Sequence, residues 1–307
     1  MFTGIIMPIL TPFTETGEVD EDALLTLADG LIDAGVHNLF VMGSAGQGPV
    51  MELDERRRTA EILIKHVAGR VPLIIHIGTP YLKTTVELAC HAHQAGADGL
   101  AAVPPYYYSD HPEAEVDAHL IGAAAATPLP FVVYNNERYT GINITAPWLK
   151  RLAGEIPNLA GIKLSFVSQG VIFSYLEMVP DRVAVYTANI LEVLPTAPFG
   201  VKGCIHPPSI LFPELAVAIW DAVQAKDYTR AFELQGRVKK ASAGLGRLER
   251  THGRFVTGEG LRIRGYDVKC YPRWAEGTPL DDDARAEIRA LLEAATPEEA
   301  TSRVALA

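Results

Sequence analysis

The 307-residue sequence has few cysteines and no long apolar segment. Its three cysteines, Cys90, Cys204 and Cys270, are odd in number and scattered, so a disulfide framework is not expected and reduced thiols are. No apolar run reaches the ~18 residues of a membrane-spanning helix. The N-terminus also lacks the basic and apolar pattern of a signal peptide. These absences lead us to expect a cytoplasmic protein.

Basic residues are also fewer than acidic residues. Lysine and arginine total 27 against 37 aspartates and glutamates, which gives a formal net charge of −10. Nucleic acids and anionic membranes are bound through basic patches, so we expect neither as a partner. A small anionic substrate is not excluded, because a site can be locally positive. The 48% hydrophobic and 21% charged residues are typical of a globular protein with a sizeable core.

Short apolar runs alternate with helical patterns through the first 225 residues. The runs begin near Gly4, His37, Val71, Ala97, Pro130, Leu159, Val183 and Lys202. Between them apolar residues recur at helical spacing. Such alternation predicts an α/β fold with a parallel sheet, and eight units of this size predict a closed (β/α)8 TIM barrel. We assign residues 1–225 to this barrel, as the catalytic domain.

The strand-like runs cease after about Asp227. Residues 228–245 and 283–294 have helical patterns. The polar segment between them contains Gly253, Gly258, Gly260 and Gly265, which favour a connection rather than a helix. We interpret residues 226–307 as a small C-terminal helical extension packed on the barrel.

One apolar run, residues 159–165, contains a single charged side chain, that of Lys163. Lysine is rarely buried without a partner or a function. Burial removes hydration and lowers the pKa of an ammonium group, which makes the neutral amine available to form a Schiff base with a carbonyl. A lysine that reaches the surface or pairs with a carboxylate is the structural alternative. This segment alone leaves both interpretations open.

Active sites of such barrels lie at the C-terminal ends of the strands, where this sequence has several polar residues. The turn 43–46 has consecutive backbone N–H groups that can hold a carboxylate, although it can also be a plain turn. Tyr134 ends the fifth run, either as a proton relay beside a reactive lysine or as a capped core tyrosine. Ser165 and His206 point to the same rim. At least one of the tyrosines 106–108 should reach a site or a subunit boundary.

Together these motifs resemble the superfamily of dihydrodipicolinate synthase and N-acetylneuraminate lyase, which are pyruvate-dependent class I aldolases. The resemblance covers residues 1–225 well and the extension loosely. In the family's order, the motifs are Gly43-Ser44-x-Gly46, Pro105-Tyr106-Tyr107, Tyr134-Asn135, Gly161-Ile162-Lys163 and Gly200-x-x-Gly203-x-Ile205.

The resemblance implies a role for each motif. Lys163 would form the Schiff base with pyruvate or another 2-oxo acid, and Tyr134 would be the general acid and base. Ser44 would position the carboxylate and pass protons to Tyr134. Tyr107, usually from a neighbouring subunit in this family, would complete the relay. Ile205 would border the pyruvate moiety through its backbone. The resemblance also implies a homotetramer of two tight dimers, and neither a metal nor an organic cofactor.

Several positions depart from the family pattern. Ala45 replaces a threonine and Gln47 a glutamate. The lost hydroxyl removes a hydrogen bond to a charged group, worth ~1.5–3 kcal/mol, so 2-oxo acid binding should be weaker or rearranged. The arginine that grips the second substrate's carboxylate in the synthase corresponds to Tyr139, with Arg138 one residue earlier. A neutral phenol cannot replace a bidentate guanidinium.

Other departures lie at the ends of the seventh and eighth runs. Ala188-Asn189 stands where the synthase and the lyase have Gly-Asp, and His206 stands where a small residue is common. We expect the catalytic core to be kept and the acceptor pocket to be altered. The residues assigned to substrate binding are Ala45, Arg138, Tyr139, Ser165, Ala188, Ile205 and His206.

The favoured function is a lyase that forms an imine between Lys163 and a 2-oxo acid and acts with an aldehyde or sugar-acid in cleavage, condensation or dehydration. True 4-hydroxy-tetrahydrodipicolinate synthase activity of lysine biosynthesis is one alternative, which Tyr139 disfavours. A relative that binds 2-oxo acids with little turnover is another. A metal-dependent aldolase is the third, but His91 and His93 on one helix face away from each other, so we expect no metal site.

Overall fold

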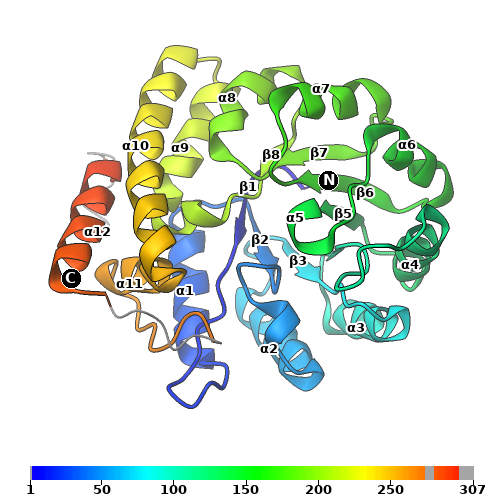
Figure 1. Ribbon diagram of the computed structural model, residues 1–307, viewed down its shortest axis with the longest axis horizontal. Coiled ribbons are helices and arrows are strands. Elements are labelled where there is room, and N and C mark those ends of the chain that lie inside the picture. Colours follow the sequence, from blue (N-terminus) through cyan, green and yellow to red (C-terminus); the bar gives the residue numbers. More distant parts are fainter. Residues whose placement is uncertain (1, 274–279, 297–307) are drawn as a thin grey trace.

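The computed structural model describes residues 2–273 and 280–296 and contains eight parallel strands closed into a barrel (Figure 1). Each strand pairs with its neighbours in sequence, and the last pairs with the first. The (β/α)8 barrel expected from the sequence is therefore confirmed. The strands are β1 (Gly4–Pro8), β2 (Asn38–Val41), β3 (Leu73–His76), β4 (Gly99–Ala102), β5 (Phe131–Asn135), β6 (Leu159–Leu164), β7 (Ala184–Thr187) and β8 (Gly203–Cys204).

Helices surround the barrel (Figure 1). In the first of them, the side chain of Asp20 caps the helix by accepting a hydrogen bond from the backbone N–H of Ala23 at 3.2 Å. Its apolar residues Leu24, Leu27 and Leu31 are buried. The barrel helices are α1 (Glu21–Asp33), α2 (Leu53–Val67), α3 (Leu82–Ala95), α4 (Glu113–Ala125), α5 (Glu137–Thr140), α6 (Ala146–Glu155), α7 (Gln169–Met178), α8 (Val193–Thr196) and α9 (Pro213–Gln224).

Successive side chains along each strand point to opposite faces, which divides the apolar residues into two cores. The outward residues pack under the helices. The inward residues fill the barrel, among them Phe40, Tyr134 and Tyr186. Glycine is required at Gly161 because a Cβ there would lie 2.5 Å from the ring of Tyr186. The hydroxyl of Tyr186 donates to the carbonyl of Phe2 at 3.0 Å. This hydrogen bond therefore links β7 to the segment that precedes β1.

The strand register brings the lysine and the tyrosine of the site together. Tyr134 on β5 is paired with Lys163 on β6, and Lys163 is paired with Tyr186 on β7. Paired residues of neighbouring parallel strands share a face of the sheet. Tyr134 and Lys163 therefore lie side by side at one level of the barrel. The sequence predicts that both side chains lie at the C-terminal ends of their strands. The register shows in addition that the two residues lie at the same height along the barrel axis.

Helices α10 (Tyr228–His252), α11 (Phe255–Ile263) and α12 (Asp282–Ala295) follow the barrel and lie along one side of it (Figure 1). The polar connection expected across Gly258 and Gly260 is wrong, because both glycines lie inside α11. A Cβ at Gly260 would lie 2.8 Å from the side chain of Leu211, so glycine allows the helix to pack closely there. Within the described residues, no helix is long and apolar enough to cross a membrane.

Arg273 joins the segment after α11 to helix α2. Its guanidinium donates two hydrogen bonds to the carboxylate of Glu55, at 2.6 and 2.8 Å. Burial would raise the pKa of Glu55, but the hydrogen bonds from Arg273 and from the backbone of Glu52, with the charge of Arg273, lower it. The pair therefore stabilises the fold above the ordinary pKa of glutamate, and this contribution is lost as the pH falls through the lowered pKa.

The Arg273→Gln variant is expected to lower the free energy of unfolding at neutral pH by about 1–2 kcal/mol, between the values for exposed and buried ion pairs. The difference from wild type should shrink in acid, because Glu55 is then protonated in both proteins. Chemical denaturation at several pH values measures this. Arg58→Gln, which removes an exposed pair with Glu21, is the control and should have a smaller effect. Equal effects of the two substitutions would contradict this role of Arg273.

Candidate active site

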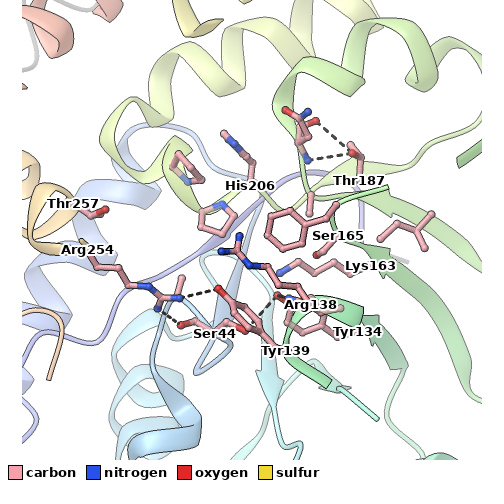
Figure 2. Close-up of a pocket in the computed structure, with 18 of the residues that line it drawn as sticks. Ser44, Tyr134, Arg138, Tyr139, Lys163, Ser165, Thr187, His206, Arg254 and Thr257 are labelled. Atoms are coloured by element: carbon pink, nitrogen blue, oxygen red, sulfur yellow. Dashed lines mark hydrogen bonds between the residues drawn. The ribbon is translucent and has the colours of Figure 1, made fainter. Parts of the chain in front are cut away.

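A cavity of about 490 Å³ lies at the C-terminal ends of the strands (Figure 2). Its wall combines the turn after β2, the ends of β5 to β8, and residues of α10 and α11. Most of the side chains proposed from the sequence meet here. Those that line the cavity are Ser44, Ala45, Tyr134, Arg138, Tyr139, Lys163, Ser165, Ala188 and His206.

Two proposed residues do not line this cavity. Ile205 is fully buried in the barrel interior, in the same cluster as Tyr134 and next to His206 in sequence. Tyr107 is 83% exposed, has a positive φ of 83°, and packs its ring edge-on against Tyr108. Within one chain, therefore, Tyr107 is not brought to the cavity.

Lys163 lies at the base of the cavity and is only 2% exposed. Its Nζ lies 3.8 Å from the ring centroid of Tyr134 and 4.9 Å from that of Phe40. Among the described residues that line the cavity, the one carboxylate is that of Glu249, which accepts a hydrogen bond from Thr257 at 3.1 Å. The environment of Lys163 is therefore aromatic and sheltered from solvent.

The hydroxyl of Tyr134 is held by two polar neighbours. Asn136 donates to it from Nδ2 at 2.9 Å, and the hydroxyl of Ser44 lies 3.4 Å away. Burial would raise the pKa of Tyr134, but the charge of Lys163 and hydrogen bonds from Ser44, Asn136 and Lys163 outweigh it, so the pKa is lowered. A phenol with a lowered pKa beside an amine is suited to proton transfer. The contribution of Asn136 was not anticipated from the sequence.

The Asn136→Ala variant is expected to move the alkaline titration of Tyr134 to higher pH. The amide N–H stabilises the phenolate, so its removal favours the neutral phenol. Ultraviolet difference spectra of tyrosinate formation, recorded against pH for wild type, Asn136→Ala and Tyr134→Phe, isolate this transition. The Tyr134→Phe spectrum identifies the signal because it should lack it. A transition at the same or lower pH in Asn136→Ala would contradict the assignment.

His206 forms part of the wall at the end of β8. Its Nδ1 lies 2.8 Å from the hydroxyl of Ser209. Burial and the nearby charge of Lys163 lower the pKa of His206 to about 3. The imidazole is therefore neutral at neutral pH, and it can hydrogen-bond a substrate hydroxyl without adding charge to the cavity.

The turn after β2 is held in place by the C-terminal extension. Arg254 donates to the carbonyl of Ser44 at 2.9 Å, and the hydroxyl of Tyr271 donates to the carbonyl of Ala45 at 3.0 Å. The backbone N–H of Arg273 donates to Oε1 of Gln47 at 2.8 Å. Gln47, noted as a departure from the family pattern, thus fixes the turn to the extension.

The extension also supplies part of the cavity wall. Arg254, at the start of α11, reaches the hydroxyl of Tyr139 with its other terminal nitrogen at 3.1 Å (Figure 2). Sequence reasoning missed these residues, because no local pattern distinguishes them from the polar face of an ordinary helix. The wall residues from the extension are Glu249, Arg254, Thr257 and Tyr271.

Metal-binding groups are absent from the part of the chain that the structure describes: no cluster of three or more histidine, cysteine or acidic side chains is suited to an ion. His91, considered above as half of a ligand pair, lies 2.9 Å from the carboxylate of Glu61 instead.

A sequence profile of the Dihydrodipicolinate synthetase family matches residues 1–295. The chain is 33% identical over 245 residues to the probable 2-dehydro-3-deoxy-D-pentonate aldolase YjhH of Escherichia coli (strain K12), which covers 79% of this chain and 81% of that protein. It is 36% identical over 205 residues to the 4-hydroxy-tetrahydrodipicolinate synthase of Salinibacter ruber, with 67% and 68% covered.

A further relative matches almost end to end. The putative 2-dehydro-3-deoxy-D-gluconate aldolase YagE of Escherichia coli (strain K12) is 30% identical over 298 residues, which is 95% of this chain and 97% of that protein. The crystal structure of YagE in complex with pyruvate has a TM-score of 0.87 to this fold and covers 95% of this chain and 98% of that one. The chain therefore belongs to the dihydrodipicolinate synthetase family of lyases.

Proposed function

We propose that the protein is a class I aldolase that joins pyruvate and an aldehyde, or cleaves the corresponding 2-oxo acid, through a Schiff base on Lys163. The observation that carries the proposal is the buried amine 3.8 Å from the Tyr134 ring, in a cavity bordered by a backbone turn. The names of YagE and YjhH, both aldolases of 2-dehydro-3-deoxy sugar acids, support this reaction class.

The first step is imine formation. The neutral amine of Lys163 attacks the C2 carbonyl of the 2-oxo acid, and water leaves to give a protonated imine. The turn at Ser44 and Ala45 is proposed to hold the substrate carboxylate through its N–H groups and the Ser44 hydroxyl. Ser165 follows the end of β6, lines the cavity with Lys163, and is proposed to border the imine.

Bond cleavage follows. The phenolate of Tyr134 takes the proton from the C4 hydroxyl as the C3–C4 bond breaks. The bonding electrons move into the protonated imine to give an enamine, and the C4 carbon leaves as an aldehyde. Protonation of the enamine at C3 and hydrolysis of the imine then release pyruvate. Condensation is the same sequence in reverse.

Pyruvate release from a panel of 2-oxo-3-deoxy acids, followed with lactate dehydrogenase, tests the reaction. We expect release with at least one acid that carries a C4 hydroxyl, and none with analogues that lack it. Pyruvate with aspartate semialdehyde is assayed separately, by the loss of pyruvate from the mixture. Turnover of that pair alone would replace the aldolase proposal with synthase activity. No turnover of any member, despite pyruvate binding, would indicate a relative that binds 2-oxo acids without reaction.

The quaternary structure is part of the proposal. We expect a cytoplasmic homotetramer of two tight dimers, in which Tyr107 completes the proton relay at Ser44 of a neighbouring subunit. The exposure of Tyr107 supports this, as does a smaller cavity of about 240 Å³ beside Ser44, lined by Tyr106 and Val103. Sedimentation analysis measures the oligomeric state, and a monomer with full activity would contradict the relay.

A further inference from the structure

His206 lines the cavity at a position where the family commonly has a small residue, and one serine fixes its orientation. The backbone N–H of Ser209 donates to the carbonyl of His206 at 3.1 Å, and the hydroxyl of Ser209 lies 2.8 Å from Nδ1 of the ring. Pro207 and Pro208 lie between the two residues and restrict the backbone. The imidazole is therefore held in place before a substrate binds.

The hydrogen bond to Ser209 also fixes the tautomer of His206. Ser209 is 1% exposed, and Nδ1 of His206 is the one partner of its hydroxyl among the described residues. If Nδ1 donated, the buried hydroxyl proton of Ser209 would have no acceptor, which is unfavourable. The hydroxyl therefore donates to Nδ1, and the proton of the neutral ring is on Nε2. Within the described part of the chain, this N–H has no acceptor, so it can donate to a ligand in the cavity.

The ring of His206 is neutral even though Lys163 is close to it. Burial and the charge of Lys163 lower the pKa of His206 to about 3. A neutral imidazole adds no second positive charge beside the amine, so it does not oppose formation of a protonated imine. Its N–H group can still polarise a carbonyl oxygen.

The strand register places His206 above Lys163. Lys163 pairs with Tyr186, and Tyr186 pairs with Gly203 of β8. His206 follows Gly203 by three residues, about 10 Å toward the C-terminal rim at the rise of a strand. The lysine side chain covers part of this height, and C2, C3 and C4 of a bound 2-oxo acid continue it. Figure 2 shows His206 and Tyr134 on opposite sides of the Lys163 amine.

We propose that the Nε2–H of His206 donates a hydrogen bond to the oxygen on C4 and stabilises the negative charge that develops there as the C3–C4 bond forms or breaks. This inference rests on the aldolase function above and deepens it. In cleavage, Tyr134 takes the proton of the C4 hydroxyl. In condensation, the aldehyde oxygen gains negative charge and takes its proton from Tyr134. The proton of His206 stays on Nε2 in both directions, so His206 acts as a fixed donor.

The His206→Leu variant separates this role from the chemistry of the Schiff base. Exchange of the C3 hydrogens of pyruvate in deuterium oxide, followed by NMR, reports imine and enamine formation without an aldehyde, and its rate should be unchanged. The kcat for cleavage of the best acid of the panel should fall by about 10²–10³-fold, the usual cost of removing one such donor. His93→Leu makes the same change at an exposed position of α3 and should leave both rates unchanged.

Two further variants distinguish the N–H group from packing. His206→Gln keeps an N–H donor near the position of Nε2 and should recover about tenfold or more of the lost kcat. Ser209→Ala keeps the ring but frees its tautomer, so it should lower kcat less than His206→Leu does. An unchanged kcat in His206→Leu would overturn the proposal. Equal losses in His206→Gln and His206→Leu would also overturn it, because packing would then explain the effect.

The wild-type enzyme shows whether the inference or the aldolase function has failed. Borohydride trapping with pyruvate, pyruvate exchange and cleavage of the panel acids are measured first. If all three occur and His206→Leu loses exchange and cleavage in parallel, His206 acts at the imine and its assignment to C4 is overturned. If the wild type forms no adduct or cleaves no acid, the aldolase function itself fails, and the role of His206 fails with it.

Discussion

The Lys163→Met variant is expected to lose aldolase turnover by at least about 10⁴-fold, because Lys163 is the one lysine among the described residues that line the cavity, and its amine is proposed to form the imine that accepts electrons from the breaking bond. Methionine keeps the length and the apolar stem of lysine but lacks the amine. Since Lys163 is buried against Phe40 and Tyr134, the substitution should preserve the packing of the barrel. Pyruvate release from the best acid of the panel measures the loss.

Lys202→Met provides the control, because it makes the same change of side chain at an exposed position just before β8. It should retain wild-type turnover, and both variants should show wild-type circular dichroism. Turnover in Lys163→Met above a thousandth of wild type would mean that the chemistry does not pass through this amine.

The second large effect is expected for Tyr134→Phe, which should lower kcat by about 10²–10⁴-fold, the usual contribution of general acid and base catalysis. The ring remains to pack against Phe40, with which Tyr134 makes an edge-on contact at 6.0 Å between centroids. Only the proton-transferring hydroxyl is removed. Steady-state kinetics with the same acid, together with the pH dependence of kcat, measure the effect.

Tyr186→Phe is a close match for this experiment, because Tyr134 and Tyr186 are the two register neighbours of Lys163. The hydroxyl of Tyr186 donates to Phe2 away from the cavity, so its loss should affect stability more than turnover. Equal losses of kcat in the two variants would show that packing in the barrel, and not proton transfer, accounts for the Tyr134 effect.

Much of the barrel was predictable because each strand–helix unit has a local sequence pattern that indicates its secondary structure. A buried strand and an amphipathic helix are read from local periodicity, and a closed parallel sheet then places all strand ends together. Residues such as Lys163, Tyr134, Ser44 and His206 therefore meet in one cavity although they are far apart in sequence. The proposed roles of these residues stay predictions, as does the domain division near residue 225.

The contribution of the extension was not predictable in the same way. Gly258 and Gly260 look like connection residues, but they lie in α11 and allow it to pack closely. Arg254 lies 91 positions after Lys163, and only the docking of α11 brings it to Tyr139. Tertiary packing overrides local propensity in both cases. The cavity therefore includes a wall that no motif of the barrel predicts.

The extension can thus influence catalysis through the turn that is proposed to hold the substrate. Arg254, Tyr271 and Arg273 contact three residues of the segment 44–47. Any shift of the extension would move the N–H groups proposed to bind the 2-oxo acid carboxylate. A misplacement of a binding group by about 1 Å can lower a rate by about 10²-fold. This arrangement links the stability of the segment around Arg273 to the geometry of the site.

Borohydride reduction of the protein in the presence of pyruvate, followed by mass spectrometry of its peptides, tests the central claim most directly. The account predicts a stable pyruvate adduct on the peptide that contains Lys163, absent from Lys163→Met and present in Lys202→Met. An unmodified Lys163 peptide, or an adduct on another lysine that persists in Lys163→Met, would contradict it.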